Sequence, residues 1–154
     1  MRLNARYKFA ERLKLADKNT ESVIQDVEIP LENAPKFLSF FMEKIKIVPI
    51  WICPVKMYNP RLTFDLYKTN SKKLYFNFGF WDVIPSNKPA GFFNRLIEQE
   101  VQNLNGKKSL YSNSFYPRKD FWKLYGGKKY LALKKKYDSE GVFHDLYEKT
   151  VLKK

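Results

Sequence analysis

Apolar and polar residues alternate most regularly between positions 74 and 81. The even positions hold leucine or phenylalanine, whereas the odd positions hold Tyr75, Asn77, Gly79 and Trp81. Alternation at period two is typical of a strand that buries one side and presents the other side to solvent or to a ligand. The pattern therefore predicts a strand over residues 74–81.

Two other segments have a weaker strand pattern. Residues 23–29 place valine and isoleucine on one face and Asp26 and Glu28 on the other, which predicts a half-buried strand. Residues 109–112 are expected to form a short strand.

The middle of the chain combines a dense apolar run with a long polar stretch. Residues 47–53 are rich in β-branched and aromatic residues, which predicts a buried strand that ends at Pro54. Residues 59–73 contain Pro60 and Asn70 and few apolar residues in period, so they are predicted to form a long loop.

Two segments show helical periodicity. The apolar positions form single stripes at Ala34, Phe37, Leu38, Phe41 and Ile45, and at Phe93, Leu96, Ile97, Val101 and Leu104. Pro35 lies in the first turn, where proline is tolerated, and Gly106 favours an end to the second helix. Towards the C-terminus we expect a helix opened by Pro117 and stopped by Gly126, then a second helix, a turn at residues 138–141 and a last helix.

The order strand, helix, strand, strand, helix, strand predicts an α+β fold. Its expected form is an antiparallel sheet with helices on one face, a ferredoxin-like split β-α-β arrangement, followed by C-terminal helices. Residues 21–154 are expected to form this single domain. Residues 1–20 are expected to be a basic lead-in, the remnant of a preceding region.

Composition and charge limit the kinds of ligand and site that the chain can have. The net charge of +13 attracts phosphates, nucleic-acid backbones and anionic membrane surfaces, although lysine-rich composition also serves solubility. Cys53 is the single cysteine, which excludes an internal disulfide and a cysteine-cluster metal site and fits a reducing compartment. His144, the single histidine, is interpreted as a surface or capping residue. We expect a cytoplasmic protein that binds no metal. Any contact of the protein with a membrane is expected to be peripheral.

The uncovered face of the predicted sheet carries the candidate chemistry. Asp26, Tyr75, Asn77 and Trp81 project from it, either towards water or into a pocket for a largely apolar ligand with a few polar anchors. Gly79 lacks a side chain on this face and is expected to leave space for a ligand. Pattern alone leaves both interpretations open.

Binding of nucleic acid is the alternative function from another class. Basic and aromatic residues alternate between positions 116 and 136, a composition that suits stacking on bases and pairing with phosphates. The helical spacing of Phe121, Trp122 and Tyr125 favours a core role instead. No nucleic-acid-binding motif accompanies them, so a stand-alone basic module for nucleic acid or an anionic membrane is the second hypothesis.

Three segments carry a family resemblance: residues 23–30 (VIQDVEIP), residues 48–55 (VPIWICPV) and residues 120–143 (DFWKLYGGKKYLALKKKYDSEGVF). In this order and spacing they resemble the C-terminal part of the delta-24 sterol reductase branch of the FAD-linked oxidases related to vanillyl-alcohol oxidase. The segments LYFNFGFW and SLYSNSFYPRKDFW continue the resemblance. It extends from about residue 20 to the end of the chain.

The resemblance implies a cap domain that closes over the isoalloxazine ring of FAD and shapes the pocket for an apolar substrate, either an alkene or an alcohol. FAD would be bound mainly by an N-terminal domain, in the same or another chain, that these residues do not encode. Hydride exchange with flavin would then require that domain, and this chain alone is expected to be inactive. It would be a truncated gene product, an isolated domain or one half of a split enzyme.

Transferred position by position, the resemblance assigns six residues to the side of the substrate and the flavin: Gln25, Asp26, Tyr75, Asn77, Tyr111 and Asn113. Tyr111 matches a tyrosine that faces the active site in related caps. A lysine that some relatives place shortly after that tyrosine is absent, and Asn113 stands there as a hydrogen-bond donor. Ser139 replaces the usual proline of the turn that follows the KYD motif.

Overall fold

A computed structural model of the chain describes residues 19–154. The lead-in predicted for residues 1–20 lies almost entirely outside the described residues. The description below therefore begins with the first strand.

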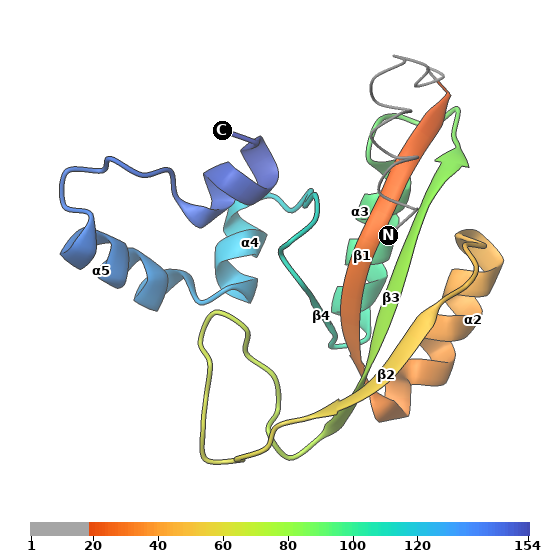
Figure 1. Ribbon diagram of the computed structural model, residues 1–154, viewed down its shortest axis with the longest axis horizontal. Helices are drawn as coiled ribbons and strands as arrows, with labels where there is room; N and C mark the ends of the chain where they lie inside the picture. The colour runs from red at the N-terminus through yellow and green to blue at the C-terminus, as the bar shows by residue number, and fades with distance from the viewer. Residues whose placement is uncertain (1–18) are drawn as a thin grey trace, which may run out of the picture.

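Four strands form one antiparallel sheet: β1 (Thr20–Pro30), β2 (Trp51–Lys56), β3 (Leu74–Pro85) and β4 (Lys107–Lys108). Their order across the sheet is β2-β3-β1-β4 (Figure 1). The long central strands β1 and β3 pair along their whole lengths, from Thr20 opposite Pro85 to Pro30 opposite Tyr75. This order is that of a split β-α-β unit, so the predicted α+β fold is confirmed.

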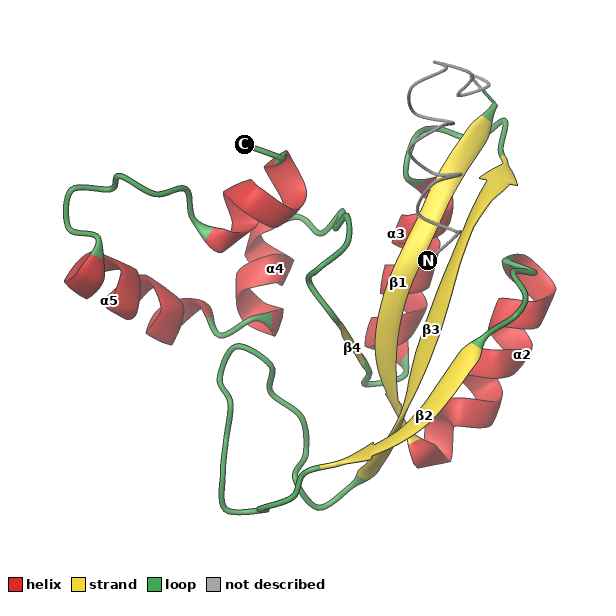
Figure 2. Cartoon of the chain, viewed as in Figure 1, coloured by secondary structure: helices red, strands yellow, loops and turns green. Residues whose placement is uncertain are grey.

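Two helices cover one face of the sheet. α2 (Ala34–Lys44) follows a short 3-10 turn, η1 (Leu31–Asn33), and α3 (Phe92–Asn103) follows β3 (Figure 2). The rings of Phe41 and Phe80 lie with their centroids 4.3 Å apart, and those of Phe37 and Phe78 lie 5.0 Å apart. The alternating phenylalanines of β3 thus meet the apolar stripe of α2, as their periods require.

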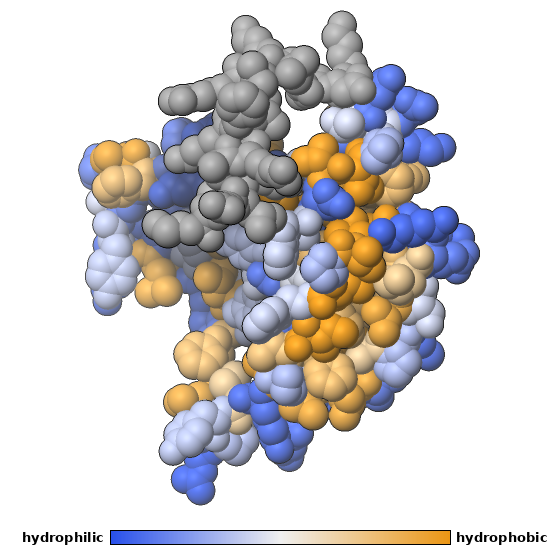
Figure 3. Space-filling model, turned by 45° about the vertical axis from the view of Figure 1, so that its right-hand side comes forward, coloured by the Kyte–Doolittle hydropathy of each residue, from blue (hydrophilic) through white to orange (hydrophobic). Residues whose placement is uncertain are grey.

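The strand predicted over residues 47–53 begins further along the sequence and is exposed. β2 begins at Trp51, lies at the sheet edge, and contains Pro54 instead of ending there. An edge strand pairs on one side only, so the missing N–H of a proline is tolerated within it. Ile47 is buried in the core before the strand begins. Apolar side chains gather in a band down the side of the molecule that carries this edge (Figure 3).

The last strand also differs from its prediction. β4 occupies Lys107–Lys108 instead of residues 109–112, because only these two residues pair with β1. Ser109 N–H still donates to Asp26 O at 2.9 Å, after which the chain leaves the sheet. Leu110 then packs against a second apolar cluster, which withdraws the following residues from β1.

The second apolar cluster holds the C-terminal part together. α4 (Arg118–Leu124), α5 (Gly127–Tyr137) and the short π-helical turn η2 (Glu148–Leu152) surround it. Its buried members are aromatic: Tyr116, Phe121, Tyr125 and Tyr147. The predicted helix after Pro117 and the stop near Gly126 are confirmed. Gly126 has a φ of +63° and packs against the backbone of Asp65, so a side chain at this position would be strained.

The core assignment predicts unequal costs for two neighbouring residues of β3. Phe80 is 1% exposed on the helix-covered face, whereas Trp81 is 44% exposed on the other face. Phe80→Ala should lower the free energy of unfolding by about 3–5 kcal/mol through the cavity it leaves. Trp81→Ala should cost about 1 kcal/mol or less. Urea unfolding of both variants tests this, and equal costs would contradict the assignment of faces.

Candidate functional site

The sheet face opposite the helices carries a row of polar side chains. The register sets Asp26 of β1 opposite Gly79 of β3, and Glu28 opposite Asn77. Tyr75 follows on the same face of β3, two residues before Asn77. Asp26, Tyr75 and Asn77 therefore share this face, which we call the open face.

The open face is less open than the sequence indicates. The segment between β2 and β3, residues 57–73, places the Tyr67 ring beside β1, and the Tyr67 hydroxyl donates to Glu28 Oε2. Asn77 Nδ2 donates to Glu28 Oε1 at 2.9 Å, and the Tyr67 hydroxyl also lies 3.2 Å from Ser109 Oγ. Glu28 is thus held by two donors that come from different segments of the chain.

Burial sets the electrostatics of this cluster. Burial raises the pKa of Glu28, the hydrogen bonds from Tyr67 and Asn77 oppose that rise, and the nearby Asp26 carboxylate adds to it. Burial and the Glu28 carboxylate together raise the pKa of Tyr67. Glu28 consequently retains a proton to higher pH than an ordinary glutamate does.

Lys107 adds a cation at the edge of the cluster. Its backbone lies opposite that of Glu28 in the β1–β4 ladder. Its side-chain Nζ donates to Leu124 O and lies 4.6 Å from the centroid of the Tyr125 ring. Burial lowers the pKa of Lys107 to about 8. The side chain is therefore directed into the C-terminal part of the chain and does not form an ion pair with Glu28.

A pocket of about 310 Å³ opens beside Glu28. Its walls are mainly apolar or aromatic, and its lining comprises Glu28, Val55, Lys56, Met57, Tyr58, Phe64, Tyr67, Thr69 and Tyr75. The Tyr75 hydroxyl accepts a hydrogen bond from Asn70 N–H at 2.9 Å, which leaves its own proton available for donation. An apolar enclosure with a few polar groups suits a largely apolar small molecule.

Asp26 and Tyr111 meet at the other end of the row. Burial and then a hydrogen bond to Asp26 raise the pKa of Tyr111, although the tyrosine side chain remains 63% exposed. A Cβ atom at Gly79 would overlap Asp26 Oδ1 and lie 3.4 Å from the Cβ of Trp51. The space that Gly79 provides is therefore filled by the Asp26 carboxylate, which corrects its interpretation as space for a ligand.

Gln25 lies on the helix-covered face and is fully buried. Its Nε2 donates to Asn94 Oδ1 of α3 at 2.8 Å, and Asn94 Nδ2 in turn donates to Glu21 Oε1 at 2.8 Å. Successive residues of a strand point to opposite faces, so Gln25 and Asp26 cannot share one site within this fold. Gln25 is separated from the open-face residues by the sheet itself.

Asn113 is exposed and lies near the C-terminus of the chain. Its backbone oxygen accepts from Lys108 Nζ, whose side chain is buried with Glu98 of α3, and its Oδ1 accepts from Lys153 Nζ. The structure thus brings together Asp26 with Tyr111 and, further along, Asn77 with Tyr75, but joins Asn113 to a different set of partners.

The sequence-based assignment missed Glu28, Tyr67 and Lys107. Glu28 could have been predicted from the sequence, because it lies two residues after Asp26 in a predicted strand and must share the same face of the sheet. Tyr67 had no such signal, since it belongs to a loop whose path follows no period. Among the described residues, no group of three or more His, Cys, Asp or Glu could hold a metal ion. No helix in residues 19–154 is both long and apolar enough to cross a membrane.

Comparison with known proteins gives one consistent result. The chain is similar to Delta(24)-sterol reductases. It is 28% identical over 129 residues to the Delta(24)-sterol reductase of Homo sapiens and 24% identical over 145 residues to that of Arabidopsis thaliana. A Delta(24)-sterol reductase homolog of Caenorhabditis elegans is 23% identical over 140 residues.

These matches cover 82%, 83% and 88% of this chain but only 25–26% of the relatives. The chain thus spans about a quarter of the length of the Delta(24)-sterol reductases it matches. No protein-family model matches it. No solved structure matches it either.

The Glu28 cluster predicts a change that can be measured at one carboxyl group. Tyr67→Phe removes a donor to the Glu28 carboxylate, so the pKa of Glu28 should rise further. A carbon-13 NMR titration of the Glu28 carboxyl carbon measures it. Tyr58→Phe, an exposed change in the same segment, should leave that pKa unchanged. An unchanged or lower Glu28 pKa in Tyr67→Phe would contradict the hydrogen bond.

Lys107 predicts a pH dependence of stability. Its pKa is about 8 in the folded chain against an ordinary 10.5, so between these values the unfolded chain binds a proton that the folded chain lacks. The contribution of Lys107 to stability therefore increases as pH rises through this window. Lys107→Met removes this increase. The free energy of unfolding of the variant minus that of wild type should therefore decrease by up to about 3 kcal/mol from pH 8 to pH 10.5.

Urea unfolding of wild type and Lys107→Met across this pH range measures the difference. Lys36→Met, on the exposed face of α2, is the matched control and should show a difference that is independent of pH. A pH-independent difference for Lys107→Met as well would exclude the depressed pKa.

Proposed function

We propose that this chain is the substrate-side part of a flavin-linked oxidoreductase that resembles the Delta(24)-sterol reductases. The observation that carries the proposal is the open face, where an apolar pocket ends at Glu28, Tyr67 and Tyr75. The similarity to Delta(24)-sterol reductases supports a sterol-like alkene as the class of ligand. The oxidoreductase activity would belong to the complete assembly and would require a flavin-binding domain besides this chain.

The described residues fit contact with the ring of FAD better than with its phosphates. Tyr111 is 63% exposed and its hydroxyl is hydrogen-bonded to Asp26, a polar arrangement that suits a ring edge. Gly126 packs against the Asp65 backbone and Gly127 against Trp122, where they separate α4 from α5, and they do not form a phosphate-binding loop. FAD, when bound, would supply hydride exchange. This chain would provide the opposing wall.

The chain's own residues would bind and orient the substrate. The aromatic walls of the pocket would exclude water around an apolar body. Glu28 holds its proton to higher pH than usual, so its carboxyl group could donate a hydrogen bond to an uncharged oxygen of the ligand. Tyr67 and Asn77 would fix the orientation of that carboxyl group through the two hydrogen bonds they already make.

The structure does not favour the alternative of a nucleic-acid module, because the aromatic residues that would stack on bases lie largely in the core. Phe121 and Tyr125 are fully buried, and the Trp122 ring stacks on Tyr130 at 4.9 Å between centroids. Phe121 and Tyr125 belong to the second apolar cluster, so their faces are not available to bases.

Binding of a Delta(24)-sterol to the purified chain tests the proposal. Equilibrium dialysis measures the binding directly, because no tryptophan lines the pocket. Phe64→Ala removes a pocket wall and should weaken binding about tenfold, because burial of an aromatic side chain stabilises by roughly 1.5–3 kcal/mol. Leu62→Ala, half exposed in the same segment but outside the pocket lining, is the matched control.

FAD is added separately in the same experiment, with the flavin absorbance spectrum as the readout. We expect no tight binding of FAD to the chain alone. Tight binding would contradict the view that the flavin is held mainly elsewhere. Sterol binding that is absent, or that is equally affected by the Phe64 and Leu62 variants, would contradict the substrate-side role of the pocket.

A further inference from the structure

The C-terminal end of α5 exposes a group of large apolar side chains. Tyr137, Val142 and Phe143 are 74%, 74% and 66% exposed, and Leu133 lies one helical turn before Tyr137. These residues belong to the part of the chain that extends furthest from the sheet (Figure 1). Exposure of four neighbouring apolar residues is unfavourable in water and marks a surface that is covered by a partner.

The turn that carries two of these residues is held in place. Asp138 Oδ1 accepts a hydrogen bond from Val142 N–H at 2.8 Å, and Asp138 Oδ2 accepts one from Phe143 N–H at 3.2 Å. Lys134 forms an ion pair with Asp138 and also donates to Phe143 O. The exposed positions of Val142 and Phe143 are therefore fixed by the turn.

Lysines surround the apolar group. Residues 128–143 contain five lysines and only two acidic residues, Asp138 and Glu140. Lys134 is paired with Asp138, and Lys129 with Asp65. Lys135 and Lys136 are exposed and form no ion pair among the described residues. The helix thus presents cations beside the exposed Leu133 and Tyr137.

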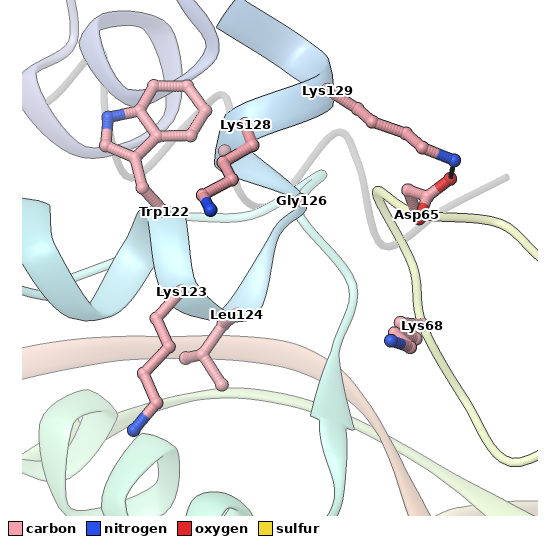
Figure 4. A pocket seen from close by; sticks show the side chains of 9 residues that line it. Asp65, Lys68, Trp122, Lys123, Leu124, Gly126, Lys128 and Lys129 are labelled. Carbon is pink, nitrogen blue, oxygen red and sulfur yellow. Dashed lines mark hydrogen bonds and ion pairs between the residues drawn. The ribbon is translucent and has the colours of Figure 1, made fainter.

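The basic surface continues to the other end of α5. A pocket of about 320 Å³ there is lined by Lys68, Lys123, Lys128 and Lys129, with Asp65 as its one carboxylate. Figure 4 shows Lys129 turned to Asp65, while the ammonium groups of Lys68, Lys123 and Lys128 have no carboxylate partner in the view. Both ends of the helix therefore attract anions.

We propose that α5 and the turn at residues 138–143 form a peripheral binding surface for an anionic phospholipid membrane. Phe143, Val142 and Tyr137 would enter the boundary between headgroups and acyl chains, and the lysines would contact the lipid phosphates. Apolar side chains that project beside cations fit a membrane better than a nucleic acid, which offers no apolar layer to Val142. This surface lies outside the open face, so the inference does not depend on the proposed function.

Co-sedimentation of the 154-residue chain with vesicles tests the surface. Vesicles of phosphatidylcholine with about a third phosphatidylserine should bind the chain, whereas pure phosphatidylcholine vesicles should bind it at least tenfold more weakly. Lys135→Glu/Lys136→Glu should weaken binding to the anionic vesicles at least tenfold. Lys36→Glu/Lys72→Glu changes the net charge equally at exposed lysines elsewhere and should weaken binding much less.

The apolar contribution needs a separate variant. Val142→Ser/Phe143→Ser keeps every charge and should weaken vesicle binding about tenfold, with the salt dependence preserved. Circular dichroism is used to check that each variant is folded. Equal losses in the two lysine variants would overturn the proposal. It would also be overturned if the serine variant bound like wild type, or if single-stranded DNA bound more tightly than the anionic vesicles.

Discussion

The buried ion pair between Lys108 and Glu98 joins the two parts of this chain. Lys108 Nζ lies 2.7 Å from Glu98 Oε1, and both side chains are almost completely buried. Glu98 also accepts a hydrogen bond from Phe115 N–H, and the Tyr125 hydroxyl donates to Lys108 O. Removing one member of such a pair leaves an uncompensated charge, which typically costs about 3–5 kcal/mol.

This constraint fixes where the second apolar cluster lies relative to the sheet, and so it shapes the open face. β4 carries Lys107 and Lys108 on opposite faces, so Lys108 is anchored to α3 while Lys107 reaches Leu124. The segment at residues 57–73 then bridges the two parts, with Tyr67 on Glu28 and Asp65 on Lys129. The pocket beside Glu28 is formed by this segment together with β1, β2 and β3.

Much of the sheet and its helices could be predicted from periodicity. The alternation over residues 74–81 and the stripe from Ala34 to Ile45 each point to one buried face, and the two faces meet in the core. The edge strand was predicted to begin at residue 47 but begins at Trp51. A dense apolar run has the same composition whether it lies within a strand or just before one, so the pattern could not locate the start. Gln25 was assigned by resemblance, and its position in the strand puts it on the helix-covered face.

The sequence by itself determined which side chains share a sheet face, because a strand turns every second residue the same way. It thereby brought Asp26, Glu28 and Asn77 together. Only the tertiary structure decided that Tyr67 closes over Glu28, that Asp26 occupies the space beside Gly79, and that Lys108 is buried against Glu98. These contacts join residues 10 to 53 positions apart in the sequence, and no local period records how distant segments meet.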